Sequence, residues 1–169
     1  ISEREQLLAD RLLLATYIHE SLQIKKSVIE IDEDDRGERN KFNYGHTFGH
    51  ALESVTAYAV NHGQAVTVGM DIANYLSMKQ GILDRDSYKQ THTLLTANFP
   101  PYEWRSLDIE RYIEYLSKDK KNIGSDLVCI LSKGFGRLIK QRVVMNESFR
   151  ESLRAYFASI SPSTNKLRG

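Results

Sequence analysis

The chain has 169 residues, of which 41% are hydrophobic and 27% charged, and its formal net charge is +1. This length suits one domain with a sizeable core, and the near-neutral charge offers no basic surface for nucleic acid. No run has the apolar length of a membrane span and no signal-peptide pattern opens the chain, so we expect no membrane partner and a cytoplasmic location.

A long amphipathic helix is predicted at the start. Ser2 and Glu5 have the spacing of a capping box, and apolar residues then recur at helical spacing as far as about Ile29. Near its end, Lys25 and Lys26 can be explained as solvated cations that favour a helix C-terminus. The apolar face comprises Leu8, Leu12, Ala15, Ile18, Leu22, Ile24 and Val28.

The acidic loop IDEDDRGERN follows and superficially suggests a calcium site. Counting from Asp32, Gly37 falls at the sixth position, but Arg36 at the fifth and Asn43 at the twelfth break the chelating pattern. We therefore expect a surface loop leading to Arg39. That guanidinium is either a surface charge or a bidentate partner for a carboxylate.

The stretch from Arg39 to Gly69 holds three of the five histidines and four of the ten glycines. Its pattern predicts a helix from Thr47 to Val60, and the i,i+4 spacing of His46 and His50 places both rings on one face. His62 follows in a short break before a second apolar stripe, so a tight corner would bring all three imidazoles together. Neutral imidazole is the commonest ligand for zinc-class metals, and helix starts can hold anions. The alternative is three ordinary hydrogen-bonded histidines.

The remainder is predicted to form further helices and one hairpin. The third helix carries His92, which we expect to be structural or exposed, and the charged run KDKKN alone predicts a solvated turn. The helix limits are marked by Gly81 at the end of the second helix, Asp84 at the start of the third, a break at Pro100 and Pro101, a short helix from Ser106 or Asp108, and Asn146 as the cap of the last.

Two segments, LVCILS and RLIKQRVV, have strand character and are joined by Lys133-Gly134-Phe135-Gly136. Cys129, the only cysteine, lies in the first of them, so an intramolecular disulfide is excluded and a buried, inert thiol is expected. The fold class predicted is mainly α, a multi-helix domain with one small antiparallel β-hairpin.

The run FNYGHTFGHALE followed by HGQAVTVGM closely resembles the signature of 3-dehydroquinate synthase and related sugar-phosphate cyclases. The resemblance extends upstream through IKKSVIEIDEDDRGER and downstream to KDKKN. It implies a C-terminal metal- and substrate-binding domain over residues 1–160 and a flexible tail over residues 161–169. It also implies an N-terminal NAD-binding domain that is absent from this chain and acts as its partner, in a full-length homodimer.

The activity that the resemblance implies is a phosphate lyase reaction of the shikimate pathway of aromatic amino acid biosynthesis. A carboxylated seven-carbon sugar phosphate (DAHP) would become 3-dehydroquinate with loss of phosphate. NAD would transiently oxidise a secondary alcohol, which zinc or cobalt would polarise.

Site residues are likewise implied by the resemblance. His46 and His62 would be the metal ligands, whereas i,i+4 spacing alone would pair His46 with His50. The remaining implied residues are His50, Asn43 and Lys120 (or its neighbour Lys121) around the phosphate, and Lys25 and Arg39 at the substrate carboxylate.

Two departures from the family pattern affect the expected activity. The third metal ligand of the family, a glutamate in a Gly-x-x-Glu segment, is not present, and Gln64 stands where the family usually has glutamate. We therefore expect the chain alone to be inactive. The alternatives are a related cyclase of secondary metabolism and a non-catalytic remnant domain; the presence of Lys25 and Arg39 favours a carboxylated substrate.

Overall fold

The structure is a computed structural model that describes residues 6–7, 9–34, 37–118 and 126–160. The chain divides into two compact units, residues 1–40 and residues 41–169, and each is described by itself. Within the described ranges, no helix combines the length and apolar character that crossing a membrane requires.

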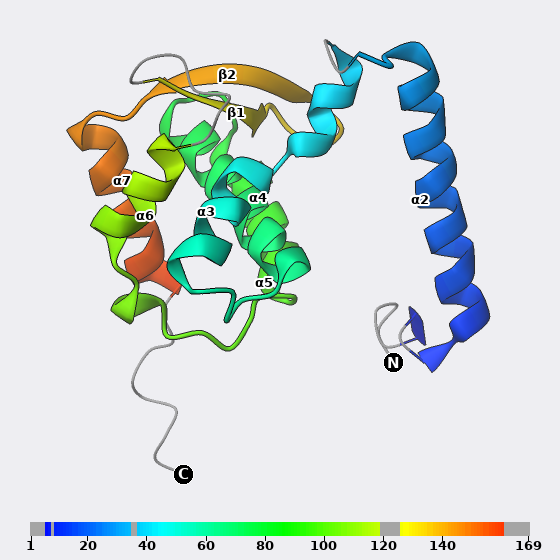
Figure 1. Cartoon of the computed structure of the whole chain (residues 1–169), viewed down its shortest axis with the longest axis horizontal. Coiled ribbons are helices and arrows are strands. Elements are labelled where there is room, and N and C mark those ends of the chain that lie inside the picture. The colour runs from blue at the N-terminus through cyan, green and yellow to red at the C-terminus, as the bar shows by residue number, and fades with distance from the viewer. Residues whose placement is uncertain (1–5, 8, 35–36, 119–125, 161–169) are drawn as a thin grey trace. The chain divides into compact units, whose positions relative to one another are not determined.

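The first unit contains one long helix, α2 Arg11–Ile31 (Figure 1). The carboxylate of Asp10 caps it by accepting hydrogen bonds from two backbone N–H groups of the first turn, at 2.9 and 3.1 Å. The predicted capping box at Ser2 and Glu5 lies outside the described residues. No residue of α2 is buried, so its predicted apolar face is not covered within the first unit.

In the second unit, one two-stranded sheet lies at an edge of a group of helices (Figure 1). The fold is mainly α with one antiparallel hairpin, as predicted from the sequence. The 3-10 helix η1 Glu38–Asn43 includes the boundary between the units. The elements that follow it in the second unit are α3 His46–Val55, α4 His62–Lys79, α5 Arg85–Thr96, the 3-10 helix η2 Trp104–Ser106, α6 Ile109–Ser117, β1 Asp126–Ser132, β2 Leu138–Val144 and α7 Glu147–Ile160.

Most predicted helix limits are confirmed. The side chains of Asp84, Asp108 and Asn146 accept hydrogen bonds from the first turns of α5, α6 and α7. Gly81 follows the end of α4 with φ +71°, the left-handed conformation that glycine adopts readily. These signals are local in sequence, which is why the pattern alone locates them.

The first helix of the histidine stretch is shorter than predicted. We expected it to reach Val60, but α3 ends at Val55 and the chain then turns through residues 56–61. Ala57 and Tyr58 have φ of 49° and 62°, and the N–H of Tyr58 donates to the carbonyl of Glu53 at 2.8 Å. Two consecutive left-handed residues cannot continue a right-handed helix, so the corner comes earlier.

The hairpin pairs β1 and β2 in antiparallel register, with Cys129 opposite Gln141 and Leu127 opposite Val143. Every residue of β1 except Asp126 is buried, whereas β2 is largely exposed. Burial raises the pKa of the Cys129 thiol to about 12. The predicted burial of the thiol is therefore confirmed, and its raised pKa disfavours the reactive thiolate.

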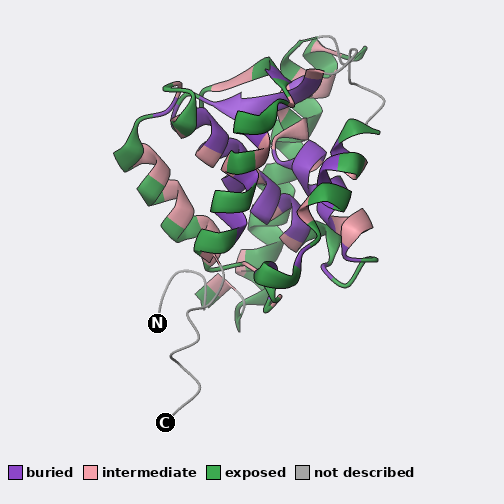
Figure 2. Cartoon of the chain, turned by 90° about the vertical axis from the view of Figure 1, so that its left-hand side faces the viewer, coloured by how far each residue is buried: buried purple, intermediate pink, exposed green. Residues whose placement is uncertain are grey.

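The core lies between α3, α4, α6, α7 and the inner face of the hairpin, and Figure 2 shows its buried residues in purple. Polar contacts fix this arrangement: the hydroxyl of Tyr112 donates to the carbonyl of Phe48 at 3.1 Å, and Ser77 Oγ accepts from the N–H of Ser132 at 3.1 Å. The fully buried large side chains include Phe48, Leu52, Ile72, Tyr112, Leu127, Leu131, Leu153, Tyr156 and Phe157.

Candidate metal centre

Helices α3 and α4 cross at glycines, so their backbones come into contact. Gly45 precedes α3 with φ +79°, and a Cβ built on Gly49 would lie 3.0 Å from the carbonyl of Ala65. Only glycine permits such an approach without displacing the neighbouring helix. The close crossing brings the start of α4 beside the first turns of α3, where the histidines lie.

Three imidazole rings meet at this crossing. The ring centroids of His46 and His50 are 5.5 Å apart, those of His46 and His62 also 5.5 Å, and those of His50 and His62 5.7 Å. Two of the rings come from α3 and the third from the first residue of α4. The cluster is thus made by one helix and the corner that follows it.

The hydrogen bonds of two rings define their tautomers. Nδ1 of His46 lies 3.2 Å from the carbonyl oxygen of Tyr44, and Nδ1 of His62 lies 3.1 Å from Oε2 of Glu53. A carbonyl and a carboxylate only accept, so in the neutral rings both Nδ1 atoms carry the proton and both Nε2 atoms carry the lone pair. A lone pair on Nε2 is what a metal ion requires of a histidine.

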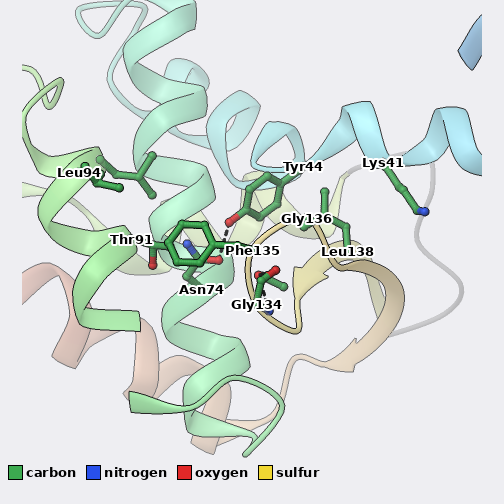
Figure 3. A pocket seen from close by; sticks show the side chains of 11 residues that line it. Lys41, Tyr44, Asn74, Thr91, Leu94, Gly134, Phe135, Gly136 and Leu138 are labelled. Atoms are coloured by element: carbon green, nitrogen blue, oxygen red, sulfur yellow. Dashed lines mark hydrogen bonds between the residues drawn. The ribbon is translucent and has the colours of Figure 1, made fainter. Parts of the chain in front are cut away.

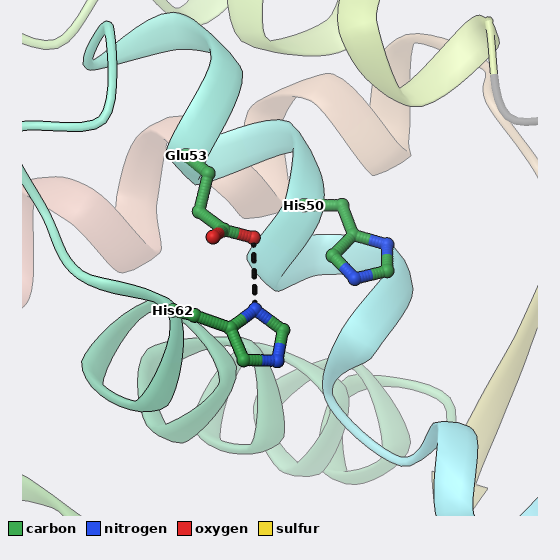
Figure 4. Close-up of side chains that lie close together, drawn as sticks. All are labelled: His50, Glu53 and His62. Carbon is green, nitrogen blue, oxygen red and sulfur yellow. Dashed lines mark hydrogen bonds and ion pairs between the residues drawn. The ribbon is translucent and has the colours of Figure 1, made fainter.

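His50 differs from the other two histidines. Its side chain is exposed, and within the described part of the chain its ring makes ring contacts but no hydrogen bond. One ligand atom each of His50, Glu53 and His62 lie within 4.8 Å of one another (Figure 4). Two histidines and a carboxylate form a set of zinc-type donors.

Glu53 is the site residue that we did not anticipate from the sequence. Its carboxylate points across the corner to His62, nine residues later (Figure 4). Gln64, by contrast, does not contact the histidines through its side-chain hydrogen bond: its Oε1 accepts from Nδ2 of Asn61 at 2.7 Å. The carboxylate beside His62 thus comes from α3 and not from position 64.

The other predicted site residues that the structure describes belong to α2 and η1. Asn43 is half-buried in η1. In the first unit, Lys25 is exposed on α2, while Arg39 anchors the acidic loop, donating from its N–H to Asp32 and from Nη1 to the carbonyl of Glu33, at 2.9 and 2.7 Å. Lys120 and Lys121 lie outside the described residues.

A second polar cluster lies inside the unit around Asp71, which is fully buried in α4. Its Oδ2 accepts from the hydroxyl of Tyr156 at 2.8 Å and lies 2.7 Å from Nδ1 of His92. The hydrogen bond to Asp71 raises the pKa of His92 above its ordinary value, although partial burial opposes this. His92 is therefore structural, as the sequence suggested, and ties α5 to α4.

A separate cavity of about 310 Å³ lies between α4, α5 and the hairpin turn (Figure 3). The hydroxyl of Tyr44 donates to Oδ1 of Asn74 at its edge, and burial raises the pKa of Tyr44 to about 12. Nδ2 of Asn74 has no hydrogen-bond partner among the described residues. Tyr44 therefore contacts both this cavity and the histidine cluster: its side chain faces the cavity, and its carbonyl accepts a hydrogen bond from His46.

Comparison with solved structures defines the class of the protein. The chain superposes on 2-deoxy-scyllo-inosose synthase complexed with carbaglucose-6-phosphate, NAD+ and Co2+ with a TM-score of 0.72 and 25% identity, covering 84% of this chain and 41% of that one. A second neighbour, the 2-epi-5-epi-valiolone synthase ValA from Streptomyces hygroscopicus subsp. jinggangensis 5008, has a TM-score of 0.61 at 16% identity and covers 79% and 38% of the two chains. These neighbours are sugar-phosphate cyclases, and the chain shares their fold.

Sequence comparison defines the family. Residues 2–122 match the model of the 3-dehydroquinate synthase C-terminal domain. The 3-dehydroquinate synthase of Helicobacter pylori (strain G27) is 36% identical over 124 residues, which are 73% of this chain and 36% of that enzyme. That of Campylobacter curvus (strain 525.92) is 34% identical over 144 residues, which are 85% of this chain and 42% of that enzyme. The chain belongs to the 3-dehydroquinate synthase family and spans about two fifths of the length of these relatives.

Proposed function

We propose that this chain is the C-terminal part of a 3-dehydroquinate synthase that converts DAHP to 3-dehydroquinate with loss of phosphate. The observation that carries the proposal is the pair formed by His46 and His62. Both direct Nδ1 to a fixed acceptor and so have the Nε2 lone pair required of a metal ligand. NAD would be bound mainly by the rest of the protein, which we propose to be a cytoplasmic homodimer.

A zinc or cobalt ion fits the donors at the α3–α4 crossing. The centroids of the three imidazole rings lie within 5.7 Å of one another, and imidazole is a suitable ligand for both metals. His46 and His62 would hold the ion, and the remaining ligand would come from outside this chain. When bound, the metal would act as a Lewis acid on a substrate hydroxyl while NAD accepts hydride.

The chain's own residues would bind and orient the anionic substrate. The exposed ring of His50 can donate to a phosphate oxygen, and α3 begins without a side-chain cap, so its positive end favours an anion there. Asn43 and Lys120 would complete the phosphate contacts, and Lys25 and Arg39 would bind the carboxylate. Holding the phosphate at a fixed position would favour its departure by elimination.

A related cyclase that acts on a sugar phosphate without a carboxylate is the second candidate. It is favoured by the structural likeness to 2-deoxy-scyllo-inosose synthase, whose solved complex contains carbaglucose-6-phosphate. The difference between the two candidates is the substrate carboxylate, for which this chain supplies Lys25 and Arg39. A remnant domain without activity is the third candidate, and the intact histidine cluster argues against it.

A chimera tests the proposal. The N-terminal part of the Campylobacter curvus enzyme is joined to this chain in place of its own C-terminal part, and phosphate release from DAHP is measured with NAD and zinc. We expect turnover from the chimera, none from the 169-residue chain alone, and none from chimeras carrying His46→Ala or His62→Ala. A folded chimera that binds NAD and zinc but turns over only a hexose phosphate without a carboxylate would establish the second candidate. A folded chimera that is inactive on both substrates would establish the third.

A further inference from the structure

We propose that Glu53 is a positioning residue for His62: its carboxylate accepts the Nδ1 proton and thereby holds Nε2 toward the metal position. The inference deepens the proposed function and rests on it for the identity of His62 as a ligand. The hydrogen bond itself, 3.1 Å between Nδ1 and Oε2, belongs to the chain alone. It can therefore be tested without metal, NAD or substrate.

The burial of Glu53 is the first argument. Its side chain is 13% exposed, whereas that of His62 is 57% exposed. A carboxylate withdrawn from water is costly unless a donor satisfies it. Among the described residues, His62 is the ion-pair partner of Glu53, and no lysine or arginine takes that place. The hydrogen bond therefore satisfies the buried carboxylate of Glu53 and also orients the imidazole of His62.

The corner between α3 and α4 is the second argument. Ala57 and Tyr58 are both in the left-handed region, and the N–H of Tyr58 returns to the carbonyl of Glu53 itself at 2.8 Å. Strained backbone of this kind persists where the surrounding structure requires it, and it concentrates at functional sites. Here the two left-handed residues reverse the chain within a few residues, and His62 therefore lies beside Glu53.

The amide at position 64 is the third argument. Gln64 and Asn61 form a closed pair: the backbone N–H of Gln64 donates to Oδ1 of Asn61 at 3.0 Å, and Nδ2 of Asn61 donates to the Gln64 side chain. The side chain of Gln64 therefore bonds to the N-cap residue of α4 and not to a histidine. The carboxylate that accepts a hydrogen bond from a histidine of the cluster is that of Glu53.

Glu53 could instead bind the metal directly, because its carboxylate lies within 4.8 Å of ligand atoms of His50 and His62. The two roles differ in chemistry. A hydrogen-bond acceptor can be replaced by glutamine, whose amide oxygen also accepts from Nδ1–H. A zinc-binding carboxylate cannot, because a neutral amide is not among the usual zinc ligands.

The test measures the tautomer of His62 in the metal-free chain labelled with 15N-histidine, using long-range 1H–15N spectra. We expect the Nδ1–H form in the wild type and in Glu53→Gln, and a shift toward Nε2–H in Glu53→Ala. Zinc affinity measured by calorimetry should fall about 10–100-fold in Glu53→Ala, the loss typical of an outer partner of a metal-binding histidine, and less than threefold in Glu53→Gln. The matched control is Glu151→Ala, an exposed glutamate on α7, which should change neither quantity.

Two results would overturn the proposal. An Nε2–H tautomer of His62 in the wild type would exclude the hydrogen bond, whether or not Glu53→Ala folds. Equal losses of zinc affinity in Glu53→Gln and Glu53→Ala would make Glu53 a ligand. Failure of the proposed function would be recognised separately, because His62→Ala would then leave zinc binding unchanged while the tautomer of the wild type still reported the Glu53 contact.

Discussion

Gly69 of α4 lies directly against the carbonyl of Gly45: a Cβ built on Gly69 would be 2.1 Å from that oxygen and 2.8 Å from the nitrogen of Gly49. Both neighbours are backbone atoms that cannot rotate away. The distance between the two helices, and with it the spacing of the three histidine rings, therefore depends on the missing side chain at residue 69.

Gly69→Ala should lower the free energy of unfolding by about 3 kcal/mol, the upper part of the range for overpacking a core. The matched control is Gly63→Ala, in the first turn of α4, where the nearest atom to the new Cβ is Oδ1 of Asn61 at 3.9 Å. That change should raise stability by about 0.5 kcal/mol through helix propensity. Urea unfolding followed by circular dichroism measures both. Equal stability of the two variants would contradict the close crossing.

Tyr58→Gly should stabilise the chain slightly. Tyr58 is 74% exposed with φ 62°, so glycine removes a left-handed penalty of roughly 1–2 kcal/mol and loses little packing. The greater flexibility of glycine offsets part of the gain, which leaves about 0.5 kcal/mol. Ala59→Gly is the control, since Ala59 is exposed without positive φ and should lose about 0.5–1 kcal/mol. Thermal unfolding of the three proteins would reveal the opposite signs.

The corner explains why the sequence located the histidine cluster but missed part of the site. The spacing of His46 and His50 and the break at His62 were sufficient to predict that the rings meet. The early end of α3 was not predictable, because alanine and tyrosine occupy the left-handed positions where glycine or asparagine would have marked a turn. The contact between Glu53 and His62 depends on that turn.

The Asp71 cluster was missed for a different reason. The hairpin and the helix caps depend on neighbouring residues, whereas Asp71 meets His92 and Tyr156 only after 21 and 85 residues of chain. A signal was nevertheless present. An aspartate within the apolar run of α4 is rarely buried unless it is paired, so its position alone indicated a buried partner.

The pairing of His92 with Asp71 should make stability depend on pH. Because the folded-state pKa of His92 is raised, the stabilisation is fully present below the unfolded-state pKa near 6.5 and is lost as pH rises through the higher folded value. The free energy of unfolding of the wild type should therefore fall, relative to that of His92→Gln, as pH rises above about 6.5. Urea titrations of both proteins below and above this pH measure the difference. A constant difference at every pH would show that folding leaves the pKa of His92 unchanged.

Zinc binding by the chain should depend on His46 and His62 far more than on His50. Loss of either ligand should weaken binding more than about 100-fold, beyond the effect of an outer partner. His50→Ala should change affinity only a few-fold, because its ring is exposed and is proposed to meet the phosphate. Calorimetric titration of the three variants separates the roles. If His50→Ala abolished binding, His50 would be a metal ligand, either paired with His46 at i,i+4 or together with Glu53 and His62.

Arg39→Ala in the chimeric enzyme should reduce kcat/KM strongly for the carboxylated substrate. Removing one charged partner from a desolvated pair costs about 2–5 kcal/mol, or roughly thirty-fold to several thousand-fold. An analogue without the carboxylate should barely register the change. Arg39 also donates to the carbonyl of Glu33, so equal losses for both substrates would mean that its role is to hold the acidic loop.

The single cysteine gives the chain a built-in reporter of core opening. Cys129 is 2% exposed on the inner strand of the hairpin, and its raised pKa keeps it as a thiol at neutral pH. A thiol reagent can reach it only when the hairpin lifts from α4 or the unit unfolds, so the rate of labelling measures how often that happens. Because the thiol is buried and protonated, zinc added to the folded chain should bind imidazoles and not the cysteine sulfur. The metal titrations and the thiol labelling can therefore be performed on the same protein without interference.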